Sequence, residues 1–364
     1  MAGAISTLVV RRRTITFLST FHPRIARAEK PTWRAGKAVA MVFRMVARVM
    51  AFVCVLCAGV AHAAAPHLFV DCRGAPSSSP TVILEAGAFG TSADWQFVLD
   101  DLAVGGRVCA YDRAGLGRSR GADEAKDVVA RARQLADLLD DMGETRPVIL
   151  VGHSNGAIYA EAFAKLWPDR VAGLVYVNGV GDDDLDDPLL LADLVKERRL
   201  SELAARVERM GFAPILAPML VSQMRLTGEA ARFKFWSLTC RACVKAARDE
   251  DRLLIPGLSA VRDLPGDVRH IPTVVIVGDT HPKSALARAF RAAEIAPATR
   301  ADHAWILDAP GATHVSPLSR DRAYVKAAVD WLRAPYQILA PPPVPDLPGP
   351  DVGQLPLPDP DVGH

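Results

Sequence analysis

One pentapeptide, Gly152–Gly156 (GHSNG), constrains the fold of this chain more than any other feature. The apolar, β-branched run Pro147–Val151 before it predicts a buried parallel strand, and Ala157–Phe163 after it predicts a helix. A chain that passes from strand to helix in so few residues must turn sharply, and glycine tolerates the crowding of such a turn. Ser154 therefore stands at the tip of the turn, at a helix N-terminus where free N–H groups favour negative charge.

The rest of the chain alternates between apolar strands and amphipathic helices, which predicts an α/β fold with a mostly parallel sheet flanked by helices. The predicted strands are His67–Asp71, Thr81–Glu85, Arg107–Tyr111, Pro147–Val151, Val171–Val177, Pro272–Asp279 and Ala304–Leu307. The predicted flanking helices include Trp95–Ala103, Ala125–Met142 and Asp321–Leu332. Between about Asp182 and Arg269 the strand pattern stops, and helices are predicted over Leu189–Met210, Ala213–Leu226 and Glu229–Leu254. We therefore predict a core from 64–181 and 271–335, interrupted by a helical cap from 182–270.

The strand–GxSxG–helix unit and the loop Asp112–Ser119 (DRAGLGRS) resemble the α/β-hydrolase superfamily over about Thr81 to Leu332. The resemblance implies an α/β-hydrolase fold in which the cap is inserted before the acid-bearing strand and Ser154 is the nucleophile. It also implies catalysis without a metal or an organic cofactor. Asp112 and Arg113 are interpreted as structural residues that tie their loop down by hydrogen bonds.

A serine hydroxyl needs a base to take its proton and an acid to orient that base. In the superfamily these follow in the order Ser, Asp or Glu, His. The matching residues are Asp279, after a sheet strand, and His314, after the last strand. Three further histidines are less suitable as the base. His153 lies beside the nucleophile, His281 lies close to Asp279 in sequence, and His303 precedes the last strand. The acid could instead follow the preceding strand, where Asn178 and Asp182–Asp184 stand, or be Asp308.

The loop Ala86–Gly90 matches the superfamily segment that contributes an N–H to the oxyanion hole, although Ala86 stands where histidine is common. The resemblance implies that the Ala88 N–H is one donor, with that of Phe89 as the alternative. The Asn155 N–H, directly after the nucleophile, is the second.

The resemblance implies a serine hydrolase that cleaves carboxylic esters of small molecules through an acyl-enzyme. The same groups cleave amides, peptides and lactones in related proteins, and a non-catalytic binding protein on this scaffold is a further alternative. Apolar cap residues could line an acyl pocket, or could simply pack the cap: Phe212, Met219, Met224, Phe233, Phe235 and Trp236.

The first 63 residues have the pattern of a targeting segment. Arg44 and Arg48 precede the apolar run Val49–Val60 and the sequence Ala61-His62-Ala63, which predicts a signal peptide cleaved after Ala63. The alternative is an uncleaved membrane anchor, and the chain could start at Met1, Met41 or Met45. After cleavage we expect an exported protein without a stable membrane span.

Charge and cysteine content agree with export. Residues 1–63 hold ten Lys and Arg against one Glu, so the remainder holds 33 basic and 40 acidic residues and has a net charge of −7, which argues against nucleic-acid binding. Four cysteines remain in an oxidising compartment, and we expect them to pair as Cys72–Cys109 and Cys240–Cys243. The alternative for the second pair is a redox Cys-x-x-Cys motif, which the absence of a neighbouring strand–helix context disfavours. The Pro-rich tail 336–364 is expected to be disordered. The oligomeric state is left open.

Overall fold

The computed structural model describes residues 68–119, 127–278 and 283–334, which belong to the compact unit Ala64–His364. The predicted signal peptide, the alternative start sites and the Pro-rich tail lie outside the described residues.

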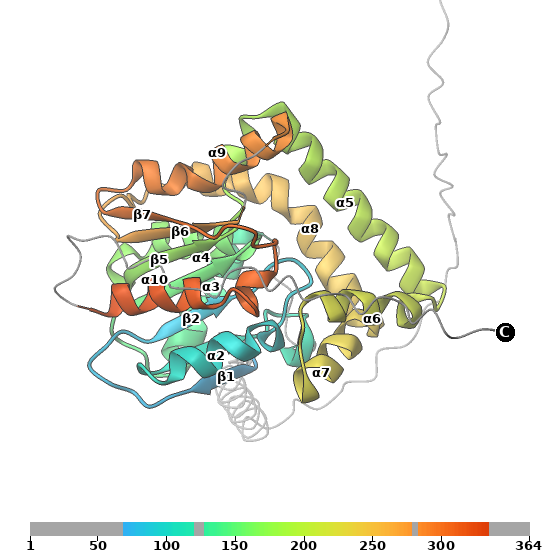
Figure 1. Cartoon of the computed structure of the whole chain (residues 1–364), viewed down its shortest axis with the longest axis horizontal. Helices are drawn as coiled ribbons and strands as arrows, with labels where there is room; N and C mark the ends of the chain where they lie inside the picture. Colours follow the sequence, from blue (N-terminus) through green and yellow to red (C-terminus); the bar gives the residue numbers. More distant parts are fainter. Residues whose placement is uncertain (1–67, 120–126, 279–282, 335–364) are drawn as a thin grey trace, which may run out of the picture. The chain divides into compact units, whose positions relative to one another are not determined.

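The core is a seven-stranded sheet in the order β1-β3-β2-β4-β5-β6-β7 (Figure 1). Its strands are β1 (Val70–Arg73), β2 (Val82–Glu85), β3 (Val108–Tyr111), β4 (Val148–His153), β5 (Val171–Val177), β6 (Thr273–Val277) and β7 (Ala304–Asp308). Only β1 runs antiparallel to its neighbour, so the predicted mostly parallel α/β sheet is confirmed. The edge strand β1 begins and ends later than predicted, at Val70 and Arg73.

Both faces of the sheet are buried because neighbouring strand residues point to opposite sides. Val148 and Leu150 of β4 pack into one apolar cluster, whereas Ile149 and Val151 pack into the other. The first cluster includes α3 (Val128–Asp141) and α4 (Gly156–Leu166), and the second includes α2 (Gln96–Ala103) and α10 (Ala323–Arg333). The near-continuous apolar strands thus have the two-sided burial that their composition predicts.

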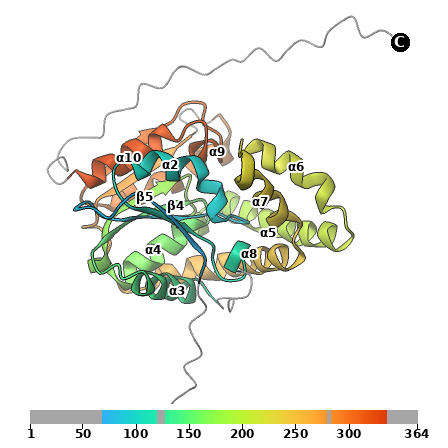
Figure 2. The same cartoon turned by 90° about the horizontal axis from the view of Figure 1, so that it is seen from below.

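Four α-helices, preceded by a 3-10 helix (Asp182–Leu185), lie between β5 and β6, and we call this segment the cap (Figures 1 and 2). They are α5 (Pro188–Arg209), α6 (Ala213–Gln223), α7 (Gly228–Thr239) and α8 (Arg241–Arg262). The single helix predicted over Glu229–Leu254 is wrong, because the chain breaks at Cys240, whose backbone is extended (φ −76°, ψ 113°). No Gly or Pro marks this break, so the helical pattern runs across it without a signal. A further helix, α9 (Ala285–Arg300), lies between β6 and β7 and was not predicted from the sequence.

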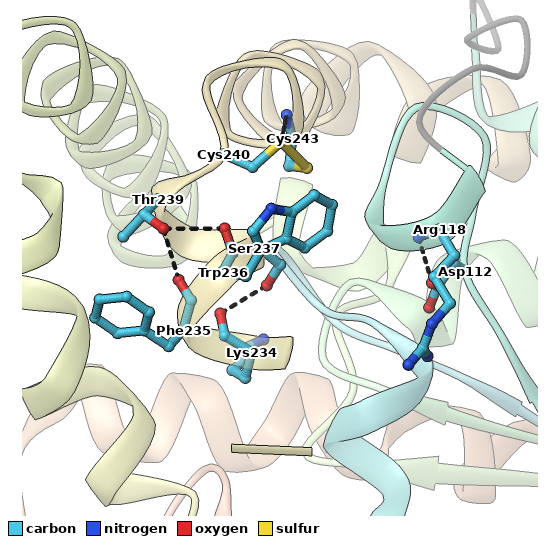
Figure 3. The surroundings of a disulfide bond; sticks show 9 residues. All are labelled: Asp112, Arg118, Lys234, Phe235, Trp236, Ser237, Thr239, Cys240 and Cys243. Atoms are coloured by element: carbon cyan, nitrogen blue, oxygen red, sulfur yellow. Dashed lines mark hydrogen bonds between the residues drawn. A yellow bond between two sulfur atoms is a disulfide. The ribbon is translucent and has the colours of Figure 1, made fainter. Parts of the chain in front are cut away.

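Both predicted disulfides are present. Cys72 and Cys109 face each other across β1 and β3 and join the edge strand to the sheet. The Cys240–Cys243 bond lies at the break between α7 and α8 (Figure 3). Cys240 caps α8 rather than lying inside a helix, and its Sγ accepts a hydrogen bond from the Cys243 N–H at 3.3 Å. The second bond therefore holds the corner between two cap helices.

None of the helices in the described ranges combines the length and the apolar character needed to cross a bilayer.

Candidate active site

Ser154 occupies a strained turn between β4 and α4. Its φ is 52°, in the left-handed region that a residue with a side chain rarely adopts. Glycine is required on both sides of it. A Cβ on Gly152 would lie 2.6 Å from the Ala157 Cα, and a Cβ on Gly156 would lie 2.3 Å from the Glu85 carbonyl oxygen. This strain is maintained by the surrounding packing, and such strain is concentrated at functional sites.

Ser154 opens into a pocket of about 290 Å³ that His314 also lines. The core contributes the strand ends and the His314 loop, and the other walls come from the start of the cap and from α9. The remaining lining residues are Asn178, Gly179, Val180, Asp184, Asp193, Leu194, Glu197, Gly278, Ala287, Phe290, Arg291, Glu294, Ala312 and Thr313. The structure thus brings the proposed nucleophile and the proposed base to one cavity, at the C-terminal edge of the sheet.

Two side chains fix the backbone at His314. The carbonyl oxygen of His314 accepts hydrogen bonds from His153 Nε2 at 2.8 Å and from Asn178 Nδ2 at 3.1 Å. The His153 ring also packs against the His314 ring, with 4.9 Å between centroids. His153 is therefore a buried positioning residue for the His314 loop. Because its Nε2 is engaged by the His314 carbonyl, His153 is not a suitable base.

Burial determines the protonation of both histidines. Removal from water lowers the pKa of His153 to about 3, so its ring is neutral near pH 7. His314 itself is exposed at the pocket, but the protein around the rest of its ring partly desolvates it and lowers its pKa below the ordinary value. A neutral imidazole at neutral pH is the form that a general base needs.

The predicted acid, Asp279, lies outside the described residues, and so does His281. The residue before Asp279 is nevertheless part of the site, because Gly278 lines the pocket. The Gly278 N–H donates to Asn178 Oδ1 at 3.3 Å, and the other end of that amide holds the His314 carbonyl. Asn178 therefore links the end of β6 to the His314 loop. This linking role of Asn178 was not predicted, because the position was weighed only as a place for an acid.

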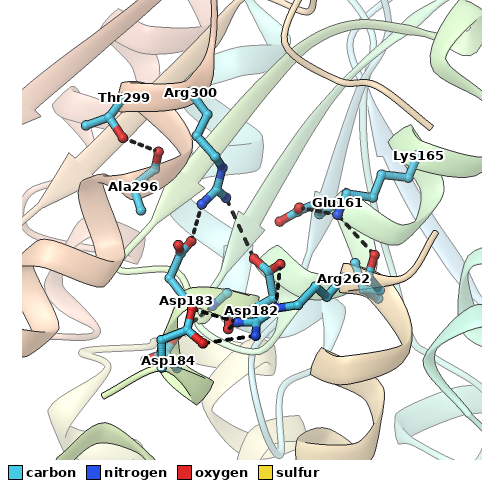
Figure 4. A network of polar contacts seen from close by, with 12 residues as sticks. Glu161, Lys165, Asp182, Asp183, Asp184, Arg262, Ala296, Thr299 and Arg300 are labelled. Atoms are coloured by element: carbon cyan, nitrogen blue, oxygen red, sulfur yellow. Dashed lines mark hydrogen bonds and ion pairs between the residues drawn. The ribbon is translucent and has the colours of Figure 1, made fainter. Parts of the chain in front are cut away.

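The aspartates that follow β5 occupy different surroundings (Figure 4). Asp182 and Asp183 pair with Arg300, and Asp182 also pairs with Arg262. Asp184 is buried, lines the pocket, and accepts a hydrogen bond from the Gly181 N–H at 2.8 Å. Burial raises the pKa of Asp184 to about 6.

Asp308 and His303 lie away from the pocket lining. Asp308 pairs with Arg291 at 2.7 Å and is not among the residues around the cavity. His303 precedes β7, and its carbonyl accepts the Thr273 N–H at 2.9 Å, at the opposite end of the strand from His314. Of the four aspartates considered beside Asp279, Asp184 is therefore the one that shares the pocket with Ser154.

The candidate oxyanion loop lies against the nucleophile. A Cβ on Gly87 would lie 3.0 Å from the Ser154 Cβ, so a side chain there would crowd Ser154. The Gly90 N–H donates to the Gly87 carbonyl at 3.0 Å and closes a turn that contains Ala88 and Phe89. Within the described ranges, neither the Ala88 N–H nor the Asn155 N–H donates to another protein group. Both are thus available for a bound oxygen, although neither residue is part of the pocket lining.

A buried network of ion pairs holds the backbone of the candidate oxyanion loop. Arg113 donates to the carbonyl oxygens of Ala86 and Gly87 and pairs with Glu85 at 2.7 Å and with Glu250 of α8 at 2.9 Å. Asp112 accepts the N–H groups of Ser92 at 2.7 Å and Arg118 at 2.8 Å. The predicted structural role of Asp112 and Arg113 is confirmed. The cap partner Glu250 was missed, because its charge in an amphipathic helix resembles any solvent-facing residue.

The cap also holds the loop directly. Lys234 of α7, drawn in Figure 3, donates to the Phe89 carbonyl at 2.9 Å and pairs with Asp94 at 2.8 Å. Both partners of this ion pair are buried. The cap is therefore connected to the candidate oxyanion loop by two charged side chains, Lys234 and Glu250.

The apolar cap residues singled out from the sequence do not line the Ser154 pocket. Phe212 and Met219 are exposed, and Met224 packs against the core cluster of α2 and α10. Phe233 stacks on Trp236, with ring centroids 5.4 Å apart. Of the two alternatives for these side chains, the structure therefore does not support an acyl pocket in this cavity.

In residues 68–119, 127–278 and 283–334, no group of three or more His, Cys, Asp or Glu side chains is arranged to hold a metal ion.

Comparisons with known proteins identify the family of this chain. The model of the Alpha/beta hydrolase family matches residues 82–328. An AB hydrolase superfamily protein of Gibberella zeae is 37% identical over 119 residues, which cover 31% of this chain and 37% of that protein. A protein named as a candidate carbamate hydrolase, RutD, of Variovorax paradoxus is 40% identical over 105 residues, 28% of this chain and 39% of its own length. The matched stretch therefore spans less than two fifths of each of these relatives.

Among solved structures, a thermophilic esterase from Thermogutta terrifontis is similar to this chain with a TM-score of 0.50 and 23% identity, over 73% of this chain and 93% of that one. This similarity supports the fold alone. Because the family model covers more than half of the chain, from β2 through the serine turn to the His314 loop, the chain belongs to the alpha/beta hydrolase family.

Proposed function

We propose that this protein is a serine hydrolase that cleaves carboxylic esters of small molecules, with Ser154 as nucleophile, His314 as base and Asp279 as the acid that orients it. The observation that carries the proposal is the strained Ser154, which opens into the same cavity as His314. A serine held in this conformation at a helix N-terminus has no evident structural role, whereas a nucleophile gains from it.

In the proposed reaction Ser154 Oγ attacks the ester carbonyl while His314 takes the hydroxyl proton. The N–H groups of Ala88 and Asn155 stabilise the oxyanion, and each such donor typically contributes about 3–4 kcal/mol. His314 then gives its proton to the leaving alcohol, and a water molecule activated by the same histidine releases the acid. Asp279 is favoured as the orienting acid because Gly278 lies at the pocket and is joined through Asn178 to the His314 loop.

The test is hydrolysis of a graded series of nitrophenyl esters by the wild type and by Ser154→Ala. We expect turnover by the wild type and a loss of roughly 10⁴-fold or more in the variant. A serine-directed phosphonate that labels Ser154 when no ester is cleaved would leave the nucleophile in place and move the reaction to amides, lactones or carbamates. Absence of both turnover and labelling would favour a non-catalytic binding protein.

The acid is tested separately with Asp279→Asn and Asp184→Asn. We expect the first variant to lose roughly 10⁴-fold in kcat, because the base would no longer be held in the correct tautomer. The second should keep kcat within about tenfold, because Asp184 is expected to shape the pocket only. The reverse result would assign the acid role to Asp184.

We also propose that the protein is exported and processed after Ala63. The two disulfides of the body support this, because such bonds persist in oxidising compartments. Mass spectrometry of the protein recovered from outside the cytoplasm should give an N-terminus at Ala64, and an N-terminus within residues 1–48 would contradict the proposal.

A further inference from the structure

The helix α6 and its flanks expose a group of large apolar side chains. Six large side chains in this short stretch are between 43% and 70% exposed: Met210, Phe212, Ile215, Leu216, Met219 and Leu220. Exposed apolar side chains that occur singly need no explanation, but a contiguous group of them marks an interaction site. We call these six residues the α6 surface.

The orientation of α6 is the reverse of what burial in a monomer favours. Residues 212, 215, 216, 219 and 220 recur at helical spacing and share one face, yet this face is the solvent-exposed one. The helix packs inward with the small residues Ala213 and Ala217, both buried. In both views α6 lies farther from the sheet than α7 does (Figures 1 and 2). None of its residues lines the Ser154 pocket, so the surface does not belong to that cavity.

Basic residues accompany this surface. On α5 and at its C-cap, Arg199, Leu203, Arg206 and Met210 recur at spacings of four and three, so they share one face, and all four are exposed. From residue 198 to residue 225 the chain holds five Arg and two Glu, a net charge of +3. The whole chain after residue 63 has a net charge of −7. A basic region is therefore concentrated on the cap of an otherwise acidic protein.

We propose that the α6 surface docks on an anionic lipid surface. From Met210 to Met224 there is no charged residue and no histidine, and the exposed arginines of α5 lie just before this stretch. An apolar helix face with arginines beside it is the arrangement that inserts at the boundary between lipid headgroups and acyl chains. With 11 residues, α6 is far too short to span a bilayer, so it would lie in the interface.

Charge favours lipid over a second copy of the chain. A symmetric dimer through this surface would bring two regions of charge +3 together, whereas an anionic membrane attracts such a region.

The direct test uses the full chain with vesicles of phosphatidylglycerol and phosphatidylcholine, with vesicles of phosphatidylcholine alone, and without vesicles. Hydrogen exchange of peptides from residues 203–224 is followed by mass spectrometry, so that the signal comes from this surface and not from residues 1–63.

We expect these peptides to be protected by the anionic vesicles at low salt, and to lose most of this protection in about 0.5 M salt or with neutral vesicles. The variant Ile215→Ser with Met219→Ser should reduce the protection and weaken partitioning roughly tenfold or more. A matched control is Val104→Ser with Ile306→Ser, which removes two exposed apolar side chains (88% and 40%) that lie outside the cap. This control should bind vesicles like the wild type.

Unchanged exchange of the α6 peptides while the chain still binds vesicles would show that another segment binds, and would overturn the proposal. Protection that depends on protein concentration without vesicles, together with a dimeric mass in solution, would assign the surface to a second copy instead. A circular-dichroism spectrum and a urea unfolding curve like those of the wild type confirm that each variant is folded, so the outcome for lipid does not depend on the ester proposal.

Discussion

At the scale of single residues, the site is determined by side chains that hold backbone in place. Asn178, itself in a left-handed conformation (φ 43°), donates to the His314 carbonyl and accepts the Gly278 N–H. His153 provides the second donor to that carbonyl. The loop that carries the proposed base is thus attached to β4 and β5 by two side chains that have no direct chemical role.

The pH dependence of activity follows from the state of His314. Desolvation lowers its pKa below 6.5, so the ring loses its proton at a lower pH than a free histidine does. Since the neutral form is the base, kcat/KM for an ester should rise with pH and reach half of its plateau below pH 6.5. A pH–rate profile of the wild type measures this midpoint.

The nearby carboxyl of Asp184, whose pKa is about 6, could contribute its own step to that profile. The same profile measured for Asp184→Asn separates the two groups, and we expect its midpoint to remain below 6.5. A midpoint above the ordinary histidine value would mean that an ionised acid stabilises the imidazolium more than burial destabilises it.

At the scale of elements, the cap and the candidate oxyanion loop form one connected structure. Lys234 on α7 reaches Asp94 and the Phe89 carbonyl, and Glu250 on α8 reaches Arg113, which holds the carbonyls of Ala86 and Gly87. These contacts are buried, so solvent screens them little. Movement of the cap should therefore be coupled to the geometry of the loop.

The ion pair between Lys234 and Asp94 can be tested by a double-mutant cycle. Lys234→Met keeps the apolar length of the side chain but leaves Asp94 buried and unpaired, which should cost about 3–5 kcal/mol of unfolding free energy in urea. Adding Asp94→Asn removes the unpaired buried charge and should recover much of the lost unfolding free energy. A coupling free energy under about 1 kcal/mol would show that the pair does not tether the cap.

At the scale of the whole molecule, the two disulfides constrain very different lengths of chain. Cys72 and Cys109 are 37 residues apart and join the edge strand to the sheet, whereas Cys240 and Cys243 are three residues apart. In the chain-entropy model a longer loop loses more freedom in the unfolded state when it is closed. The first bond should therefore contribute more to global stability.

Replacing Cys72 and Cys109 by Ala should lower the unfolding free energy by about 4 kcal/mol in this model. The matched pair of replacements at Cys240 and Cys243 should lower it by about 2 kcal/mol. Urea unfolding of both variants beside the wild type gives the comparison. Equal losses, or a larger loss for the second pair, would contradict the loop-length argument and point to strain or packing at the corner between α7 and α8.

The amino-acid sequence alone predicted the strands and the position of the serine turn. These features depend on local chemistry: apolar β-branched runs make strands, and only glycine fits on either side of Ser154. The structural roles of Asp112 and Arg113 and the place of His314 followed from the motifs beside them.

Only the tertiary structure decided what lies far apart in the sequence but close in space. The link from Asn178 to Gly278 and His314, and the pair of Arg113 with Glu250, join residues 100 and more positions apart. Local sequence patterns also did not predict the helix break at Cys240 or the exposure of the apolar face of α6. Periodicity shows that a helix has an apolar face, but the packing of the other helices decides whether that face is buried or exposed.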